Sequence, residues 1–174
     1  VAGLARETVK GGSWRMAAVG AALVLIVGVN WTARTADDAR TWDEAWRIEQ
    51  DILGVARATI PDPAPGTSIF LFGAPRATRA EVPVFFGTED LGPALRLQLH
   101  GDVSGIPMQG ATRVVCRREG PGTVDGFLPP QSGARYGKTV FLDYGGRRAL
   151  PVPDRQTCRA LAPTLASGPI SLYP

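Results

Sequence analysis

Few side chains in this sequence have the chemistry that catalysis needs. His100 is the only histidine, and therefore the only conventional base near neutral pH. It precedes Gly101 at an expected helix end, where a histidine more often caps the last carbonyls. Glu89 and Asp90 are adjacent, so on a helix they point in different directions, and the helix dipole already explains them. We predict no catalytic residue.

An acid, an aromatic ring and a base surround the glycine pair at 145–146. These side chains, Asp143, Tyr144 and Arg147, could recognise a sugar or a peptide. We favour the simpler interpretation that they stabilise a turn. The sequence contains no nucleophile-elbow, phosphate-loop or dinucleotide-binding motif. With one histidine and no Cys-x-x-Cys spacing, we expect neither a metal nor a cofactor.

The chain has two cysteines, Cys116 and Cys158. An even number in an oxidising compartment favours one disulfide, although two buried free thiols are the alternative. The bridge would close a loop of about forty residues and contribute about 3–4 kcal/mol on a chain-entropy account. We predict the disulfide.

Residues 16–33 contain no ionisable side chain. As a helix, this stretch is about 27 Å long, which is close to the hydrocarbon thickness of a bilayer. The tryptophans at its ends are placed as interfacial anchors, or alternatively pack against a neighbouring helix. We therefore predict a transmembrane helix over 14–34, with its interface anchors at Trp14, Arg15, Trp31 and Arg34.

The charges beside the span indicate its orientation. Arg6, Lys10 and Arg15 precede it with Glu7 as the only acid, which favours a cytoplasmic flank at 1–13. Residues 35–174 would then form an extracytoplasmic domain at the cell membrane. A cleaved signal peptide is the competing interpretation, but the apolar stretch is long for one and lacks a clean cleavage site. Both interpretations export the domain.

Small residues recur every four positions in the span, at Ala17 and Ala21 and at Ala18 and Ala22. Such faces let helices approach closely in lipid, so we expect the bilayer and other transmembrane helices, of the same or a partner protein, as partners. A compositional bias toward alanine is the alternative. Beyond residue 35, fifteen basic and fifteen acidic side chains balance, which gives no reason to expect nucleic acid as a partner.

The rest of the sequence predicts one mixed domain. We expect a helix to residue 59, capped by Thr35 or Asp37, with Trp42 and Trp46 in the core. Pro61 ends it, and a buried strand at 67–72 and a weaker one at 82–86 follow. The next helix begins with Thr88 as its cap, tolerates an early proline and ends at 100.

The last third reads mainly as strands and loops. We expect strands at 112–117 and 138–144, loops at 120–122 and 129–133, a hairpin through 145–146 into 147–150, and a short helix at 154–161. The fold class is therefore α/β or α+β: one N-terminal transmembrane helix followed by a small domain with about two to three helices and four to six strands.

Residues 42–91 contain a spacing of aromatic, proline and glycine residues: Trp42-x3-Trp46-x3-Gln50-x2-Leu53, then Ile60-Pro61, Gly66-Thr67, Gly73-Ala74-Pro75, Phe85 and Asp90-Leu91. Over about 14–100, the chain resembles the C-terminal region of bacterial multi-pass membrane proteins of the glycosyltransferase-C type, which use polyprenyl-phosphate sugars. The resemblance implies a non-catalytic accessory domain, because that family's catalytic acids would lie in early loops.

Two functional hypotheses follow. The first is the terminal transmembrane helix and extracytoplasmic accessory domain of a bacterial envelope protein linked to glycosyl transfer to cell-surface glycans. The second is a single-pass, membrane-anchored binding or interaction domain without catalysis. A tethered hydrolase lacks a nucleophile and base in a suitable context. Because the sequence begins at Val1, we expect either a non-AUG start or a piece of a longer protein.

Overall fold

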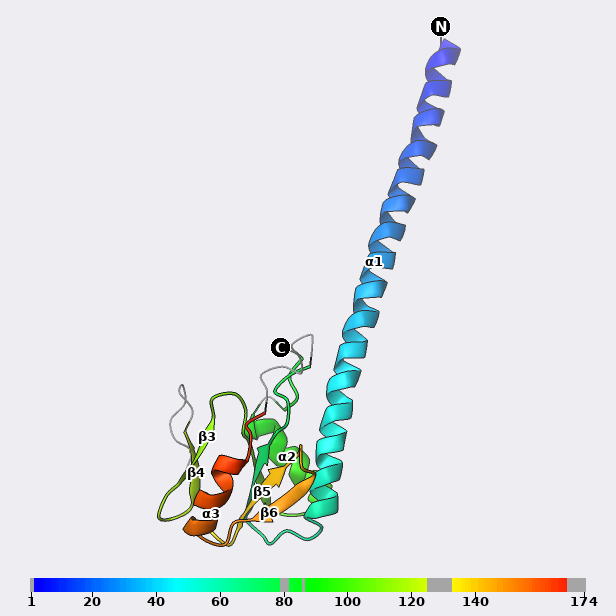
Figure 1. Ribbon diagram of the computed structural model, residues 1–174. Coiled ribbons are helices and arrows are strands. Elements are labelled where there is room, and N and C mark those ends of the chain that lie inside the picture. Colours follow the sequence, from blue (N-terminus) through cyan, green and yellow to red (C-terminus); the bar gives the residue numbers. More distant parts are fainter. Residues whose placement is uncertain (1, 79–81, 86, 125–132, 169–174) are drawn as a thin grey trace. The chain divides into compact units, whose positions relative to one another are not determined.

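The computed structural model describes residues 2–78, 82–85, 87–124 and 133–168 (Figure 1). These residues form three α-helices and six strands, an α+β fold as the sequence predicted. The elements are α1 (Ala2–Thr59), β1 (Thr67–Phe72), α2 (Thr88–Leu99), β2 (Val103–Pro107), β3 (Arg113–Cys116), β4 (Pro121–Val124), β5 (Thr139–Asp143), β6 (Arg148–Pro151) and α3 (Arg155–Leu161), with a 3-10 turn at Ala162–Thr164.

The chain divides into two compact units, 1–40 and 41–174. The described residues of the first unit, 2–40, are all helical. Among the described residues one helix, Met16–Thr59, is long and apolar enough to cross a membrane: its best 18-residue window has a mean hydropathy of 1.9 and none of it is buried. The length and composition of this helix therefore suit the predicted span.

α1 continues without a break through the position where we expected a second helix to begin. The Thr35 hydroxyl donates to the Trp31 carbonyl at 2.9 Å, and the Thr32 hydroxyl donates to the Gly28 carbonyl at 2.8 Å. These hydroxyls bond within the helix and do not cap a new one, so the predicted cap at 35 or 37 is wrong. The predicted end near 59 is confirmed, because Pro61 cannot continue the ladder.

The second unit contains a four-stranded sheet in the order β2-β1-β5-β6. β1 is parallel to β2 and to β5, with Phe70 opposite Ile106 and Phe141. β5 and β6 form the predicted antiparallel hairpin. β1 is buried along its whole length, as expected for a central strand with both faces covered. β3 and β4 pair separately and antiparallel.

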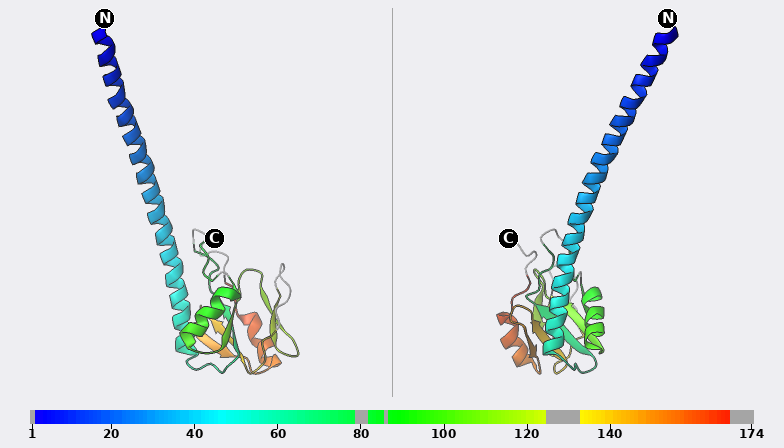
Figure 2. Two further views of the ribbon diagram at one scale, coloured as in Figure 1. Left: turned by 180° about the vertical axis from the view of Figure 1, so that it is seen from behind. Right: turned by 90° about the vertical axis from the view of Figure 1, so that its right-hand side faces the viewer.

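The sheet divides the core into two clusters. On one face, the last turns of α1 and α2 bring Ile52 and Leu95 against Ile69, Leu71 and Leu142. On the other face, the alternate residues of β1 and β5 pack with Met108, Val152, Cys158 and Leu165. The right-hand view of Figure 2 shows α2 and α3 on opposite sides of the sheet.

Residues 82–85 form a loop, so the strand predicted at 82–86 is wrong over the described part; residue 86 lies outside it. Only an isolated bridge joins Ala77 to Pro83, and a proline cannot donate to a ladder. Phe85 has a positive φ of 55° and is buried with Val84. Their side chains fill the core without strand pairing.

Two strands lie where we predicted none. β2 contains Ser104, Gly105 and Pro107, and β4 begins at Pro121 within the predicted loop at 120–122. Pairing with β1 and with β3 compensates for these weak local preferences. Of the loop predicted at 129–133, residues 129–132 lie outside the described residues.

Trp42 and Trp46 are 61% and 58% exposed, so their predicted place in the core is wrong. The buried side of α1 instead carries Ala45, Ile52 and Ala56, whose four-residue and seven-residue spacings keep them on one face.

We therefore expect Trp42→Ala and Trp46→Ala each to lower the free energy of unfolding by less than about 1 kcal/mol, since little packing is lost. Ile52→Ala, at a position with no exposed surface, should cost about 2–5 kcal/mol. Urea denaturation of the full chain in detergent micelles, followed by circular dichroism, measures both. Equal losses at positions 46 and 52 would contradict the assignment.

Candidate functional site

The side chains first considered for catalysis mark the two ends of α2. The helix begins at Thr88 with Gly87 as its N-cap, so Thr88 is the first helical residue and not the predicted cap. Glu89 and Asp90 lie in the first turn, as predicted. His100 is the C-cap, exposed and left-handed with a φ of 51°. In the described part of the chain, no three His, Cys, Asp or Glu side chains are grouped to hold a metal.

The two cysteines form the predicted disulfide. Cys116 is the last residue of β3, and Cys158 lies fully buried on α3. Arg155 adds a second link between α3 and β3, because its Nε donates to the Cys116 carbonyl at 3.0 Å. The bridge fixes the β3–β4 pair against α3 on one side of the sheet.

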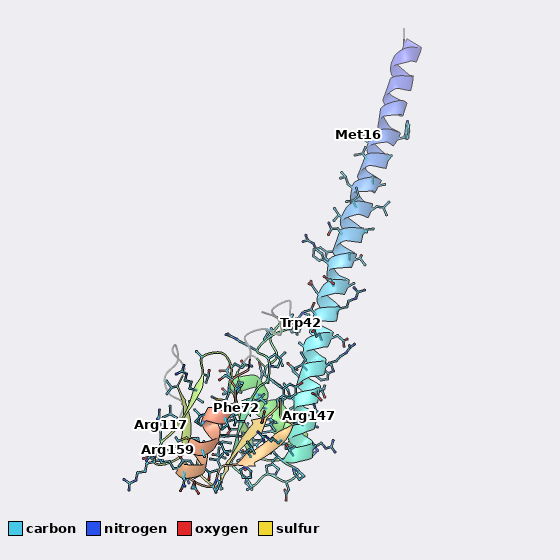
Figure 3. The ribbon with its side chains drawn as sticks, in the orientation of Figure 1. Met16, Trp42, Phe72, Arg117, Arg147 and Arg159 are labelled. Atoms are coloured by element: carbon cyan, nitrogen blue, oxygen red, sulfur yellow. A yellow bond between two sulfur atoms is a disulfide. The ribbon has the colours of Figure 1, made fainter. Side chains whose placement is uncertain are left out.

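The turn between β5 and β6 is tied to α1 through Asp51. Arg147 donates two hydrogen bonds to the Asp51 carboxylate at 2.9 and 3.0 Å, and the Tyr144 hydroxyl donates a third at 2.9 Å. Arg147 has a φ of 49° in the turn. Figure 3 shows Arg147 on the side of the domain beside the end of α1. Tyr144 and Arg147 therefore clamp a helix to a hairpin, a tertiary contact beyond the turn role that we favoured for them.

Asp143 completes the turn from within. Its carboxylate accepts from the Gly146 amide and from Arg148 Nε, both at 3.0 Å. Gly73, with a φ of 74°, passes so close that an added Cβ would lie 3.2 Å from the Gly145 nitrogen. Glycine at 73 thus lets the end of β1 approach this turn.

The clamp makes one part of the stability depend on pH. The hydrogen bonds from Arg147, and then from Tyr144, hold the pKa of Asp51 below its ordinary value. A lowered folded-state pKa stabilises the fold above the unfolded value of about 4, and this contribution disappears as the pH falls through the folded value. Because the Asp51 side chain is 42% exposed, solvent screening limits the contribution to about 1 kcal/mol or less.

We therefore expect Asp51→Asn to be less stable than the wild type at pH 7, and this difference to vanish toward pH 2. Urea denaturation of both proteins across that range measures it. Asp62→Asn, at an exposed carboxylate outside the clamp, is the matched control. A wild-type advantage that persists unchanged at pH 2 would contradict the role of the charged clamp.

A pocket with a volume of about 380 Å³ lies at the outer edge of the sheet, and we call it the β2-edge pocket. The strands β1 and β2, the helix α2 and the two segments at 121 and 133–134 form its walls. The lining residues are Gly66, Ser68, Phe70, Thr88, Gly92, Pro93, Arg96, Ser104, Gly105, Ile106, Pro121, Gly133 and Ala134.

Three hydroxyl residues, Ser68, Thr88 and Ser104, and the Arg96 guanidinium give this pocket its polar character. Ser104 donates to Ser68 at 3.1 Å between the two Oγ atoms, and Ser68 is only 6% exposed. Arg96 Nε donates to the Val103 carbonyl at 2.8 Å, which holds the guanidinium at the edge strand. The pocket can therefore donate several hydrogen bonds and offers one positive charge.

Close packing of α2 on β2 sets the position of Arg96. A Cβ on Gly105 would come within 2.6 Å of Leu91 Cγ and 3.0 Å of the Gly92 nitrogen. Glycine at 105 thus allows α2 to lie directly on the strand. Sequence reasoning missed this pocket because it missed β2, and Arg96 alone gave no signal.

The predicted interface anchors lie on α1. Trp14 and Trp31 are 63% and 74% exposed, and Arg34 is exposed as well. The side chain of Arg15 lies outside the described residues. Exposed indoles at these positions are compatible with headgroup contacts, and the anchoring role stays a prediction.

Comparisons of the chain with protein-family models, curated proteins and solved structures gave no match. The resemblance to glycosyltransferase-C proteins therefore stays a prediction from residue spacing.

Proposed function

We propose that this chain is a membrane-anchored binding domain whose folded unit, residues 41–174, works outside the cytoplasm. The observation that carries the proposal is the apolar window on α1, which is hydrophobic enough for a bilayer and has no buried surface. The Cys116–Cys158 disulfide supports export, because such bonds persist in oxidising compartments. The β2-edge pocket supports binding, since its volume is in the usual range for small-ligand sites.

Protease protection in bacterial spheroplasts tests this topology. The full chain carries one epitope tag before residue 2 and another after residue 174. We expect external protease to remove the C-terminal tag while the N-terminal tag survives, and carbonate washing to leave the chain in the membrane. A cytosolic marker protein controls for lysis. Protection of the C-terminal tag, or release of the chain by carbonate, would overturn the proposal.

An accessory role beside other membrane helices is the second candidate. It is favoured by the small residues of the span, Gly20 and Gly28 among them, which let a neighbouring helix approach closely in lipid. Together with the resemblance over 14–100, this supports an accessory domain of an envelope protein linked to glycosyl transfer. Sequencing upstream of Val1 tests it: we expect further hydrophobic spans in the same reading frame, and a start site immediately before Val1 would exclude the same-chain version.

A further inference from the structure

We infer that the β2-edge pocket binds a ligand through a carboxylate, with Arg96 as the anion-binding residue and the Ser68–Ser104 hydroxyl pair as a second polar part of the lining. This inference rests on the proposed binding function and names its ligand class.

Arg96 is placed to bind an anion. Its Nε donates to the Val103 carbonyl at 2.8 Å, which orients the guanidinium, and among the described residues its two Nη groups have no hydrogen-bond partner. Within the described ranges, no acidic side chain forms an ion pair with Arg96. Of the described residues that line the pocket, it is also the only charged one. As far as the described residues line it, the pocket thus presents an uncompensated positive charge.

The planar shape of the Arg96 guanidinium favours a carboxylate as its ligand. A guanidinium presents parallel N–H groups in a plane, which match the two oxygens of a carboxylate. Around it, Pro93 and Ile106 contribute accessible carbon surface that can cover the remainder of a small ligand. A charged hydrogen bond at the rim of such a pocket contributes more than one in open water.

The hydroxyl pair supplies a second point of recognition. The Ser104 hydroxyl donates its hydrogen bond to Ser68. The Ser68 hydroxyl can therefore donate to a ligand, and the Ser104 oxygen can accept from one. Ser68 and Ser104 sit opposite each other on β1 and β2, and therefore on the same face of the sheet. A ligand that carries a polar group as well as a carboxylate would satisfy both.

Two sources supply this chemistry: the free C-terminus of a short peptide, and an acidic sugar. Isothermal titration of the full chain, in nanodiscs of uncharged phosphatidylcholine, distinguishes them. The probes are N-acetyl-alanyl-alanine and glucuronic acid, each paired with a neutral analogue: the peptide amide and glucose. We expect at least one carboxylate probe to bind at least about 10-fold more tightly than its neutral analogue.

Variants connect that binding to the pocket. Arg96→Gln should weaken the carboxylate probe at least about 10-fold, Arg96→Lys should keep part of the affinity, and Ser104→Ala should weaken it several-fold. Arg57→Gln, at another exposed helical arginine but outside the pocket, should change nothing. Urea midpoints of all variants verify folding, and the carboxylate–neutral comparison on the wild type needs no variant.

Each outcome has a definite meaning. Binding of the peptide alone assigns a chain terminus, binding of glucuronic acid alone assigns an acidic sugar, and binding of both assigns the shared carboxylate. Equal affinity for acid and neutral analogues, no binding of either acid, or equal losses in Arg57→Gln and Arg96→Gln would overturn the inference. The topology experiment is independent, so its failure is recognised separately.

Discussion

Phe141→Ala is expected to lower the free energy of unfolding by about 3–5 kcal/mol, because it removes a large buried ring from the core on one face of the sheet. Phe141 has no exposed surface and packs edge-on against two rings, with centroid distances of 5.5 Å to Phe70 and 5.2 Å to Phe72. Its loss removes both aromatic contacts and leaves a cavity that the rigid central strands cannot close. Urea denaturation of the full chain in micelles measures the change.

Two matched variants test whether packing is the cause. Phe141→Leu keeps most of the buried volume and should lose clearly less stability than Phe141→Ala. Leu97→Ala removes an apolar side chain that is 78% exposed on α2, so it should change stability by about 0.5 kcal/mol or less. If Phe141→Ala behaved like Leu97→Ala, the assignment of Phe141 to the core would be wrong.

The strands that could be predicted are those whose own residues specify them. β1 is a continuous apolar run between Gly66 and Gly73, and β5 leads into a Gly-Gly turn, so local composition was sufficient. β2 and β4 have glycine and proline in place of such runs, and they become strands only through their partners. Local patterns could not reveal pairing that tertiary structure imposes.

In the candidate site, too, local contacts could be predicted from the sequence and long-range contacts could not. The turn role of Asp143 was visible in the sequence, because its partner lies three residues away. Arg147 and Asp51 are separated by 96 residues and join only when the hairpin reaches α1. The β2-edge pocket depends on the pairing of Ser68 with Ser104, which the missed strand supplies. Functional geometry assembled across the sheet is therefore the part that required the structure.

The long α1 illustrates how one helix serves two environments. Its best apolar window is wholly exposed, whereas Ile52 and Ala56 near its end have no exposed surface at all. A span that had to end before the domain would need a breaker, and the first proline comes only at 61. With no proline before that position, nothing in the backbone forced α1 to end at 35–37, where we had predicted a boundary.

Removing the disulfide by Cys116→Ser with Cys158→Ser is expected to lower the free energy of unfolding by about 4 kcal/mol, on the chain-entropy account for a loop of this size. The bridge joins residues 42 apart in sequence, and it restricts the unfolded chain much more than the folded one. Cys158 is also fully buried, so two serines add a packing and desolvation cost to the entropic one. Urea denaturation of the double variant and the wild type measures the total.

Reductant separates the crosslink from the substitutions. Added to the wild type, it should shift the urea midpoint most of the way toward that of the double variant, while the double variant itself should not respond. Mass spectrometry of the non-reduced digest should show a peptide that contains both Cys116 and Cys158. If the reduced wild type kept its original urea midpoint, the bridge would contribute nothing to stability, and packing alone would hold β3 against α3.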